Sequence, residues 1–179
     1  MSSLECKNLA EQMKQIFYLN KFGMNLNDKC KNLDLFNLHI TNLKSSNNTR
    51  NFLYSLFDPK IQFYFPNVFL HENSFTQIFK EKNVIYLSPH ATEELTEYNH
   101  ESFYIIGGIV DRRNIIELTP ERSRELGIKS IKLPTQALLK KQILSLVDVF
   151  KFLHQFKYNP SKLNKDINIS SFIKNHIKT

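Results

Sequence analysis

The chain contains few of the residues and segments that mark several common protein classes. Among its 179 residues are two cysteines, Cys6 and Cys30, which do not form a CxxC pair. Two cysteines are too few for a disulfide framework and favour a reducing compartment. No apolar run has the length of a membrane span, so we expect no membrane partner. The first residues have neither the basic nor the apolar part of a signal peptide, and we expect no secretory leader there.

Sequence motifs of several enzyme classes are also missing. The chain has no GxGxxG, GxxxxGK[ST], HExxH or GxSxG pattern. This excludes the usual dinucleotide, phosphate-loop, zinc-protease and α/β-hydrolase sites. The six histidines are scattered along the chain, and each is expected to be a surface or structural residue. We therefore predict no metal site.

The composition is that of a soluble globular domain with an excess of positive charge. Hydrophobic residues make up 41% of the chain and charged residues 23%, and the net charge is +7. A length of 179 residues favours a single domain with a real core. The charge is consistent with a polyanionic partner, either nucleic acid or an anionic membrane surface, and equally with a solubilising surface.

Apolar spacing and capping residues predict alternating strands and helices. Ser2 and Glu5 have the spacing of a capping box, and so do Ser145 and Asp148. Helices are predicted at 3–19, 49–57, 74–80, 92–98, 119–127 and from 146 onward, and strands at 35–43, 84–87, 103–106 and 128–133. On the inner face of the last helix we expect Val149, Phe150, Leu153 and Phe156. This order predicts an α/β fold with a mostly parallel sheet flanked by helices.

An aromatic-rich stretch lies at residues 61–70 and includes Phe63, Tyr64, Phe65 and Phe69. Interleaved aromatic rings can stack on bases. Because only Lys60 lies beside them to hold a phosphate, we expect these rings to pack under a loop instead.

The most informative stretch runs from Phe103 to Arg113. An apolar strand, expected to be buried on both faces, leads into Gly107 and Gly108, which are half of the four glycines in the chain. Paired glycines suggest a sharp turn or close approach to a ligand. Asp111 follows the strand's carboxyl end, where open α/β sheets bind their ligands, so we predict the active site here.

Several motifs together resemble the tRNA purine-nine N1-methyltransferases of the knotted SPOUT class. They are Tyr104–Arg112 (YIIGGIVDR), Glu125–Pro134 (ELGIKSIKLP) and Ile143–Leu146 (ILSL) with Val149-Phe150, preceded in order by 38–43 and 84–88. The resemblance covers roughly residues 1–154. Tyr86–His90 (YLSPH) and Tyr98-Asn99-His100 are more similar to the mitochondrial branch, whose members also serve as a subunit of protein-only RNase P.

The resemblance implies a fold, a cofactor and site residues. Residues 1–158 would form the SPOUT methyltransferase domain with a C-terminal trefoil knot, with its first strand missing or upstream, and 159–179 a Lys/Asn-rich tail. S-adenosyl-L-methionine would be bound by Leu87, Gly107, Gly108, Asp111, Arg112, Arg113, Leu133, Leu144, Ser145 and Leu146. tRNA would be bound by Gln12, Asn20, Lys21, Arg112, Arg113, Lys129 and Lys132.

Asp111 corresponds to the family's proposed general base. N1 of guanine is a poor nucleophile until its proton leaves, and a carboxylate within reach could accept that proton. Two alternatives remain open: stabilisation of the donor's sulfonium by charge, or simple pairing with Arg112, Arg113 or Arg122. Guanine and adenine are both open as substrates.

The resemblance also implies partners and a compartment. In the mitochondrial branch these are a short-chain dehydrogenase-type scaffold protein and a nuclease subunit, and the family is thought of as monomeric. We expect a mitochondrial location, with nuclear or cytoplasmic alternatives. Thr135 and Gln136 follow the Leu-Pro pair where an apolar residue and often glycine are usual, and Val147 replaces a common asparagine. These departures favour the second hypothesis, a non-catalytic or weakly catalytic tRNA-binding scaffold.

Overall fold

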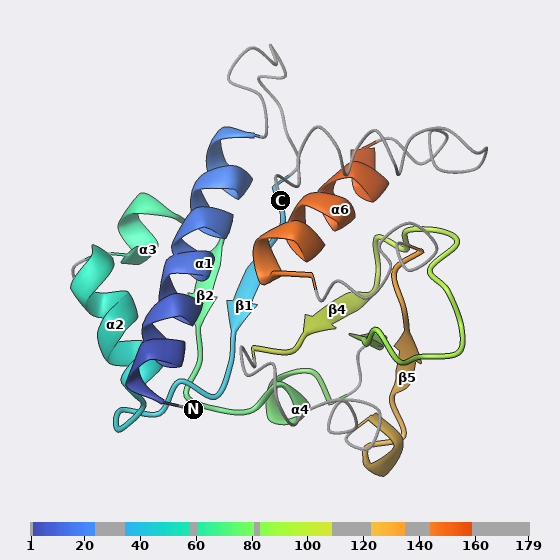
Figure 1. The fold of residues 1–179 in the computed structure, drawn as a ribbon, viewed down its shortest axis with the longest axis horizontal. Coiled ribbons are helices and arrows are strands. Elements are labelled where there is room, and N and C mark those ends of the chain that lie inside the picture. Colours follow the sequence, from blue (N-terminus) through green and yellow to red (C-terminus); the bar gives the residue numbers. More distant parts are fainter. Residues whose placement is uncertain are drawn as a thin grey trace. The chain divides into compact units, whose positions relative to one another are not determined.

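The computed structural model describes residues 2–23, 35–57, 61–80, 83–108, 123–134 and 144–158. These residues gather into two compact units. The first unit holds the described residues up to 80, and the second holds those from 83 onward. Both units contain helices and parallel strands (Figure 1), which confirms the predicted α/β class and the parallel strand pairing.

The first unit begins with helix α1, Ser3–Phe22. The predicted capping box is confirmed: Ser2 accepts the Glu5 N–H and its own N–H donates to the Glu5 carboxylate. Gly23 ends the helix with φ of 79° and donates its N–H to Leu19 O (2.9 Å). A positive φ is cheap only for glycine, which explains why the helix ends there.

Helix α1 lies beside α2, Asn48–Phe57, and the two share a core with the segment that follows α2 (Figure 1). This segment contains α3, Ile61–Tyr64, β2, Val68–Leu70, and α4, Phe75–Ile78. The fully buried members of the unit include Phe17, Leu53, Ile61 and Val68. Burial of four such side chains stabilises the unit by roughly 6–12 kcal/mol before chain entropy is counted.

Strand β1, Leu38–Ile40, is shorter than the predicted 35–43. It pairs in parallel with β2, from Leu38↔Val68 to Ile40↔Leu70. The strand ends because Asn42 adopts φ of 61°, a left-handed conformation that asparagine tolerates better than most residues. Apolar and polar residues continue to alternate in the sequence past Asn42, but the backbone does not continue as a strand.

Asn20 attaches the end of α1 to the segment that enters β1. Its side chain is only 4% exposed. The amide Nδ2 donates to Phe36 O (2.9 Å) and Oδ1 accepts the Phe36 N–H (3.0 Å). One side chain thus forms hydrogen bonds with both backbone groups of Phe36, a residue that lies outside the helices and strands.

We expect Asn20→Ala to lower the free energy of unfolding by about 2 kcal/mol, because it leaves both Phe36 groups without their partner. Urea denaturation followed by circular dichroism measures the loss. The control is Asn67→Ala, which removes an exposed side-chain bond to Asn37 and should change stability by less than about 0.5 kcal/mol. Equal losses in the two variants would contradict the role assigned to Asn20.

A ring cluster surrounds His39 on β1. The His39 ring stacks on Phe69 (centroids 4.7 Å apart) and its Nδ1 lies 3.0 Å from His71 Nε2. Phe79 meets the same ring edge-on. Burial, and secondarily the neighbouring His71, lower the pKa of His39 below its ordinary 6.5.

Because the pKa of His39 is lower in the folded protein than in the unfolded chain, the unfolded chain binds more protons at His39 just below pH 6.5. The contribution of His39 to stability is therefore complete above that pH and is lost as the pH falls through the folded pKa. We expect His39→Phe, which keeps a ring on Phe69, to flatten the fall of the unfolding free energy between about pH 7 and about pH 5. Thermal unfolding across this range is the measurement, and an unchanged slope would contradict the assignment.

The second unit is built on a three-stranded parallel sheet in the order β4-β3-β5. Strand β3 is Val84–Leu87, β4 is Phe103–Ile106 and β5 is Lys129–Ile131. The predictions for β3 and β4 are confirmed residue by residue. However, all four β4 residues are only half-buried, and the expectation of burial on both faces was wrong. Among the described strands β4 lies at an edge, next to β3 alone, so its neighbours cover less of it.

The helix predicted at 92–98 is wrong. Glu94 forms a parallel bridge with Lys132, and Leu95 N–H donates to Lys132 O (2.9 Å). Leu95 is 3% exposed. The segment is extended because its backbone continues the pairing of β5, which outweighs the helix propensity of its glutamates. Beyond it, Tyr98 stacks on Tyr104 of β4 (5.1 Å).

The last described element is α6, Leu146–Tyr158. Its predicted cap is confirmed: Ser145 Oγ donates to Asp148 Oδ2 (2.6 Å) and accepts the Asp148 N–H (3.2 Å). Among the residues predicted to face inward, Phe150, Leu153 and Phe156 are buried, whereas Val149 is half-exposed. Val147 and Phe152 are buried as well.

The helix predicted at 119–127 is confirmed only in its described part. Of the helix predicted at 119–127, the structure describes Ser123–Glu125 as helical and Gly127 with φ of 62°, as expected for a glycine that ends a helix. Residues 109–122, 135–143 and the tail at 159–179 lie outside the described residues. No helix in the described part of the chain is long and apolar enough to cross a membrane.

Candidate functional site

The carboxyl ends of three parallel strands meet at one edge of the second unit's sheet. Leu87, the last residue of β3, pairs with Ile106 of β4 on one side and with Ile131 of β5 on the other. Gly107 and Gly108 continue directly from β4. The edge therefore brings together three segments whose ends, Leu87, Ile106 and Ile131, are separated by 19 and 25 residues in the sequence.

The turn after β3 is tightly held. Ser88 is 2% exposed, and its N–H donates to Ile131 O (3.0 Å). Its Oγ accepts the His90 N–H (3.3 Å), and its carbonyl accepts the Ala91 N–H (3.3 Å). The bond to Ile131 O ties the ends of β3 and β5 to each other, and the other two close the turn after β3.

Four of the predicted donor-binding residues, Leu87, Gly107, Gly108 and Leu133, lie in or next to the strands that form this edge. Leu87 (8% exposed) and Leu133 (7%) are buried. They can offer a ligand apolar contact and backbone groups but no polar side chain. Gly107 and Gly108 are half-exposed and leave the backbone after β4 uncovered by side chains. Ser145 lies at the start of α6 with its hydroxyl engaged by Asp148.

Leu144 and Leu146, the neighbours of Ser145, are half-exposed. The remaining members of the predicted set, Asp111, Arg112 and Arg113, lie outside the described residues, three to five positions beyond Gly108. Their roles stay predictions. Within the described residues, no group of three or more His, Cys, Asp or Glu side chains could hold a metal ion.

Two of the predicted RNA-binding lysines belong to the same unit and face acidic partners. Lys129 Nζ lies 2.7 Å from Glu93 Oε2, and Lys132 Nζ lies 3.5 Å from Glu94 Oε1. Both pairs are at least partly exposed, so each contributes little to stability. An RNA phosphate would have to compete with these carboxylates for the two lysines.

The other predicted RNA-binding residues are on α1 in the first unit. Gln12 is half-exposed, and Asn20 is buried with its amide bound to Phe36. Lys21 is exposed and donates from Nζ to Tyr64 O (2.6 Å). Of the three, Lys21 has the position best suited to reach a phosphate.

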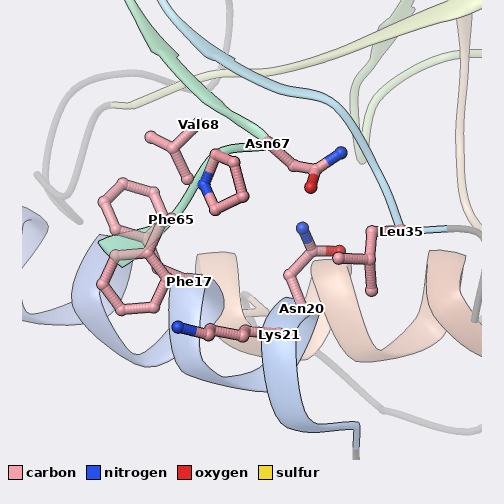
Figure 2. A pocket seen from close by; sticks show the side chains of 8 residues that line it. Phe17, Asn20, Lys21, Leu35, Phe65, Asn67 and Val68 are labelled. Atoms are coloured by element: carbon pink, nitrogen blue, oxygen red, sulfur yellow. The ribbon is translucent and has the colours of Figure 1, made fainter. Parts of the chain in front are cut away.

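A small hollow lies beside Lys21 (Figure 2). Its lining comprises Phe17, Asn20, Lys21, Leu35, Phe65, Pro66, Asn67 and Val68. The cavity volume of ≈ 10 Å³ is enough for about one water molecule and far too small for a nucleoside. It therefore cannot be a donor pocket, which keeps the strand edge as the candidate site.

The expectation that the rings of residues 61–70 pack under a loop was wrong for Phe63 and Tyr64, which are 83% and 50% exposed. Sequence patterns also missed the exposed rings of Tyr18 and Phe22. Tyr18 and Phe22 are one helical turn apart on either side of Lys21, a spacing visible in the sequence. Their approach to α3 depends on how the chain returns past α1, and no local pattern contains that information.

Comparisons with known proteins agree with this architecture. The family model described as tRNA (guanine(9)-N(1))-methyltransferase TRM10/TRM10A matches residues 1–162. The Drosophila melanogaster mitochondrial ribonuclease P protein 1 homolog is 29% identical over 144 residues, which is 78% of this chain and 29% of that protein. The Danio rerio tRNA methyltransferase 10 homolog B is 26% identical over 162 residues, 86% of this chain and 48% of that protein.

A solved structure described as a full-length spTrm10–SAH complex shares the fold. Its TM-score is 0.73 at 24% identity, and the likeness covers 88% of this chain and 82% of that one. The chain matches between about a fifth and a half of the length of its curated relatives. The match of the family model to nearly the whole sequence places the chain in the TRM10/TRM10A family of tRNA (guanine(9)-N(1))-methyltransferases.

Proposed function

We propose that the chain is the catalytic domain of an S-adenosyl-L-methionine-dependent methyltransferase that modifies N1 of a purine at tRNA position nine. The observation that carries this proposal is the family match over residues 1–162. The common edge of β3, β4 and β5 supports it, because open parallel sheets bind their ligands at the carboxyl ends of their strands.

The residues at this edge suit a donor that has an adenosine part. Buried Leu87 and Leu133 give apolar walls, and Gly107 and Gly108 leave backbone N–H and C=O groups within reach of a ligand. Arg112, Arg113, Leu144, Ser145 and Leu146 complete the proposed binding set. S-adenosyl-L-methionine, when bound, supplies an electrophilic methyl group.

In this proposal Asp111 is the general base. The N1 proton of guanine must leave as the nitrogen becomes a nucleophile, and the Asp111 carboxylate accepts that proton. Asp111 follows Gly108 by three positions in the sequence, so the proposal requires its carboxylate to act at the carboxyl end of β4. Lys21, Lys129 and Lys132 contact tRNA phosphates, and Gln12 is a further member of the RNA-binding set. Asn20, predicted as another member, is buried with its amide bound to Phe36, and we leave it out of the proposal.

We also propose the finer features of this assignment. The C-terminal part forms a trefoil knot, a proposal supported by the fold shared with spTrm10. The protein acts in mitochondria, where its partners are tRNA, a dehydrogenase-type scaffold protein and a nuclease subunit. Support comes from the name of the Drosophila melanogaster relative.

A second candidate function is a tRNA-binding scaffold of a mitochondrial RNase P with little or no catalysis. Two observations favour it: the name of the same relative, and the burial of apolar Val147 in the first turn of α6, where the family resemblance leads us to expect asparagine. The two candidates differ in whether the strand edge binds a methyl donor.

We expect the folded protein to bind one S-adenosyl-L-methionine per chain in a calorimetric titration. Asn20→Ala, which is altered in the other unit, serves as a control under conditions in which it stays folded, and it should bind equally. If folded protein gives no binding heat at several temperatures, the proposal of an enzyme is overturned and the proposal of a tRNA-binding scaffold remains.

We expect Asp111→Asn to keep donor and tRNA affinity and to slow single-turnover methyl transfer by roughly two orders of magnitude, the usual scale for loss of a general base. The amide keeps the size of the carboxylate but cannot accept the proton in the same way. Raising the pH should recover part of the rate in the variant, because the N1 proton is then lost to solvent. An unchanged rate constant would exclude Asp111 as the base.

A further inference from the structure

Exposed aromatic rings and one lysine gather on the first unit. We call the set formed by Tyr18, Lys21 and Phe22 of α1 and Phe63 and Tyr64 of α3 the aromatic–lysine patch. The exposed fraction of the aromatic residues is 83% for Phe63, 54% for Phe22, 50% for Tyr64 and 46% for Tyr18. Such rings are unusual at the surface unless they serve a contact.

Contacts within the patch hold it in place. Buried Phe65 lies beneath it and meets Tyr18 edge-on (centroids 5.2 Å apart). Tyr18 stacks with Phe22 (5.9 Å), and Phe63 meets Tyr64 edge-on (5.7 Å). Tyr18 is therefore positioned by the core, whereas Phe63 contacts the neighbouring ring of Tyr64 and presents most of its surface to solvent.

Lys21 connects the two helices of the patch. Its Nζ lies 5.3 Å from the Phe65 ring centroid and 5.4 Å from that of Phe22, and it donates to Tyr64 O. An ammonium group has three N–H donors, so the bond to Tyr64 leaves donors for a second acceptor. Figure 2 shows the Lys21 side chain beside Phe17 and Phe65, at the margin of the hollow.

We propose that the aromatic–lysine patch binds an unpaired nucleotide of an RNA, with the base stacked on the exposed Phe63 ring and a neighbouring phosphate held by Lys21. This rests on the proposed function only in its choice of RNA as the ligand. The hollow beside Lys21 is too small to admit a base, so the base lies on the surface of the patch, as in sequence-tolerant single-strand binding.

Charge favours RNA over an apolar protein partner. The patch carries one cation and no acidic residue, and the chain as a whole carries +7. An apolar protein surface would have to desolvate the Lys21 ammonium group, which is unfavourable, whereas a phosphate neutralises it. In the sequence only Lys60 lies beside these rings, which spoke against base stacking. In the structure, Lys21 of α1 is a second cation next to them.

Fluorescence anisotropy with two labelled oligoribonucleotides of about ten residues tests this proposal. One has normal bases and the other is abasic, so that both present the same phosphates. Wild-type protein should bind the normal strand about tenfold more tightly than the abasic one. Phe63→Ala should remove most of this difference while leaving the abasic affinity unchanged.

Three further variants sharpen the result. Phe63→Leu keeps apolar area but has no ring face, so it should behave like Phe63→Ala. Leu4→Ala removes an apolar side chain of 67% exposure at the opposite end of α1 and should match wild type. Lys21→Ala should weaken the binding of both strands. It should also reduce the slope of log affinity against log salt concentration by about one.

Several outcomes would overturn the proposal that the aromatic–lysine patch binds a nucleotide. One is equal affinity of wild type for the two strands; another is a Phe63→Ala loss that is the same on both. Full preference of Phe63→Leu for the normal strand would show that the base does not stack on the Phe63 ring, and it too would overturn the proposal. Methylation of tRNA by wild type, measured in parallel, separates the two proposals: if methylation occurs without these effects, only the patch fails. Wild-type protein that neither binds RNA nor methylates tRNA overturns the proposed function as well.

Discussion

Parallel pairing of β3 with two neighbours is the constraint on which the second unit depends. Leu87 is in register with Ile106 and with Ile131, so three chain segments must end at the same level. Ser88 fixes the first turn beyond that level through its bond to Ile131 O. Our proposal places the methyl donor at this common level, where strand register brings residues that are distant in the sequence close together.

The first unit obeys a different constraint. Its strands are only three residues long, too short to hold a sheet by themselves, and its stability depends on aromatic packing around Phe17 and on Asn20. Phe17 contacts both Phe57 and Phe65 (5.6 and 5.8 Å between centroids). Their sequence neighbours Phe63 and Tyr64 are exposed.

Local signals in the sequence predicted most of the elements. The capping boxes at Ser2 and Ser145 placed two helix starts correctly, since a cap is a contact between residues three apart. The β4 boundary was predicted from the apolar run that ends at the paired glycines. In each case the residues that decide the structure are close neighbours in the chain.

Errors arose where distant segments decide the conformation. Residues 92–98 have a helical composition, but backbone bonds to Lys132 make them extended. Burial of β4 was overestimated because the prediction could not include which strand flanks it. The candidate site was predicted from a motif and a family resemblance, and the structure adds the common strand edge, while Asp111 lies outside its described residues.

The central claim is that the methyl donor binds at the common edge of β3, β4 and β5. Amide chemical shifts of ¹⁵N-labelled protein, recorded by NMR during titration with S-adenosyl-L-methionine, test it most directly. The account predicts the largest changes at Leu87, Ser88, Gly107, Gly108 and Leu133, with α1 and α2 little affected. Changes confined to the first unit, or no changes at saturating donor, would contradict it.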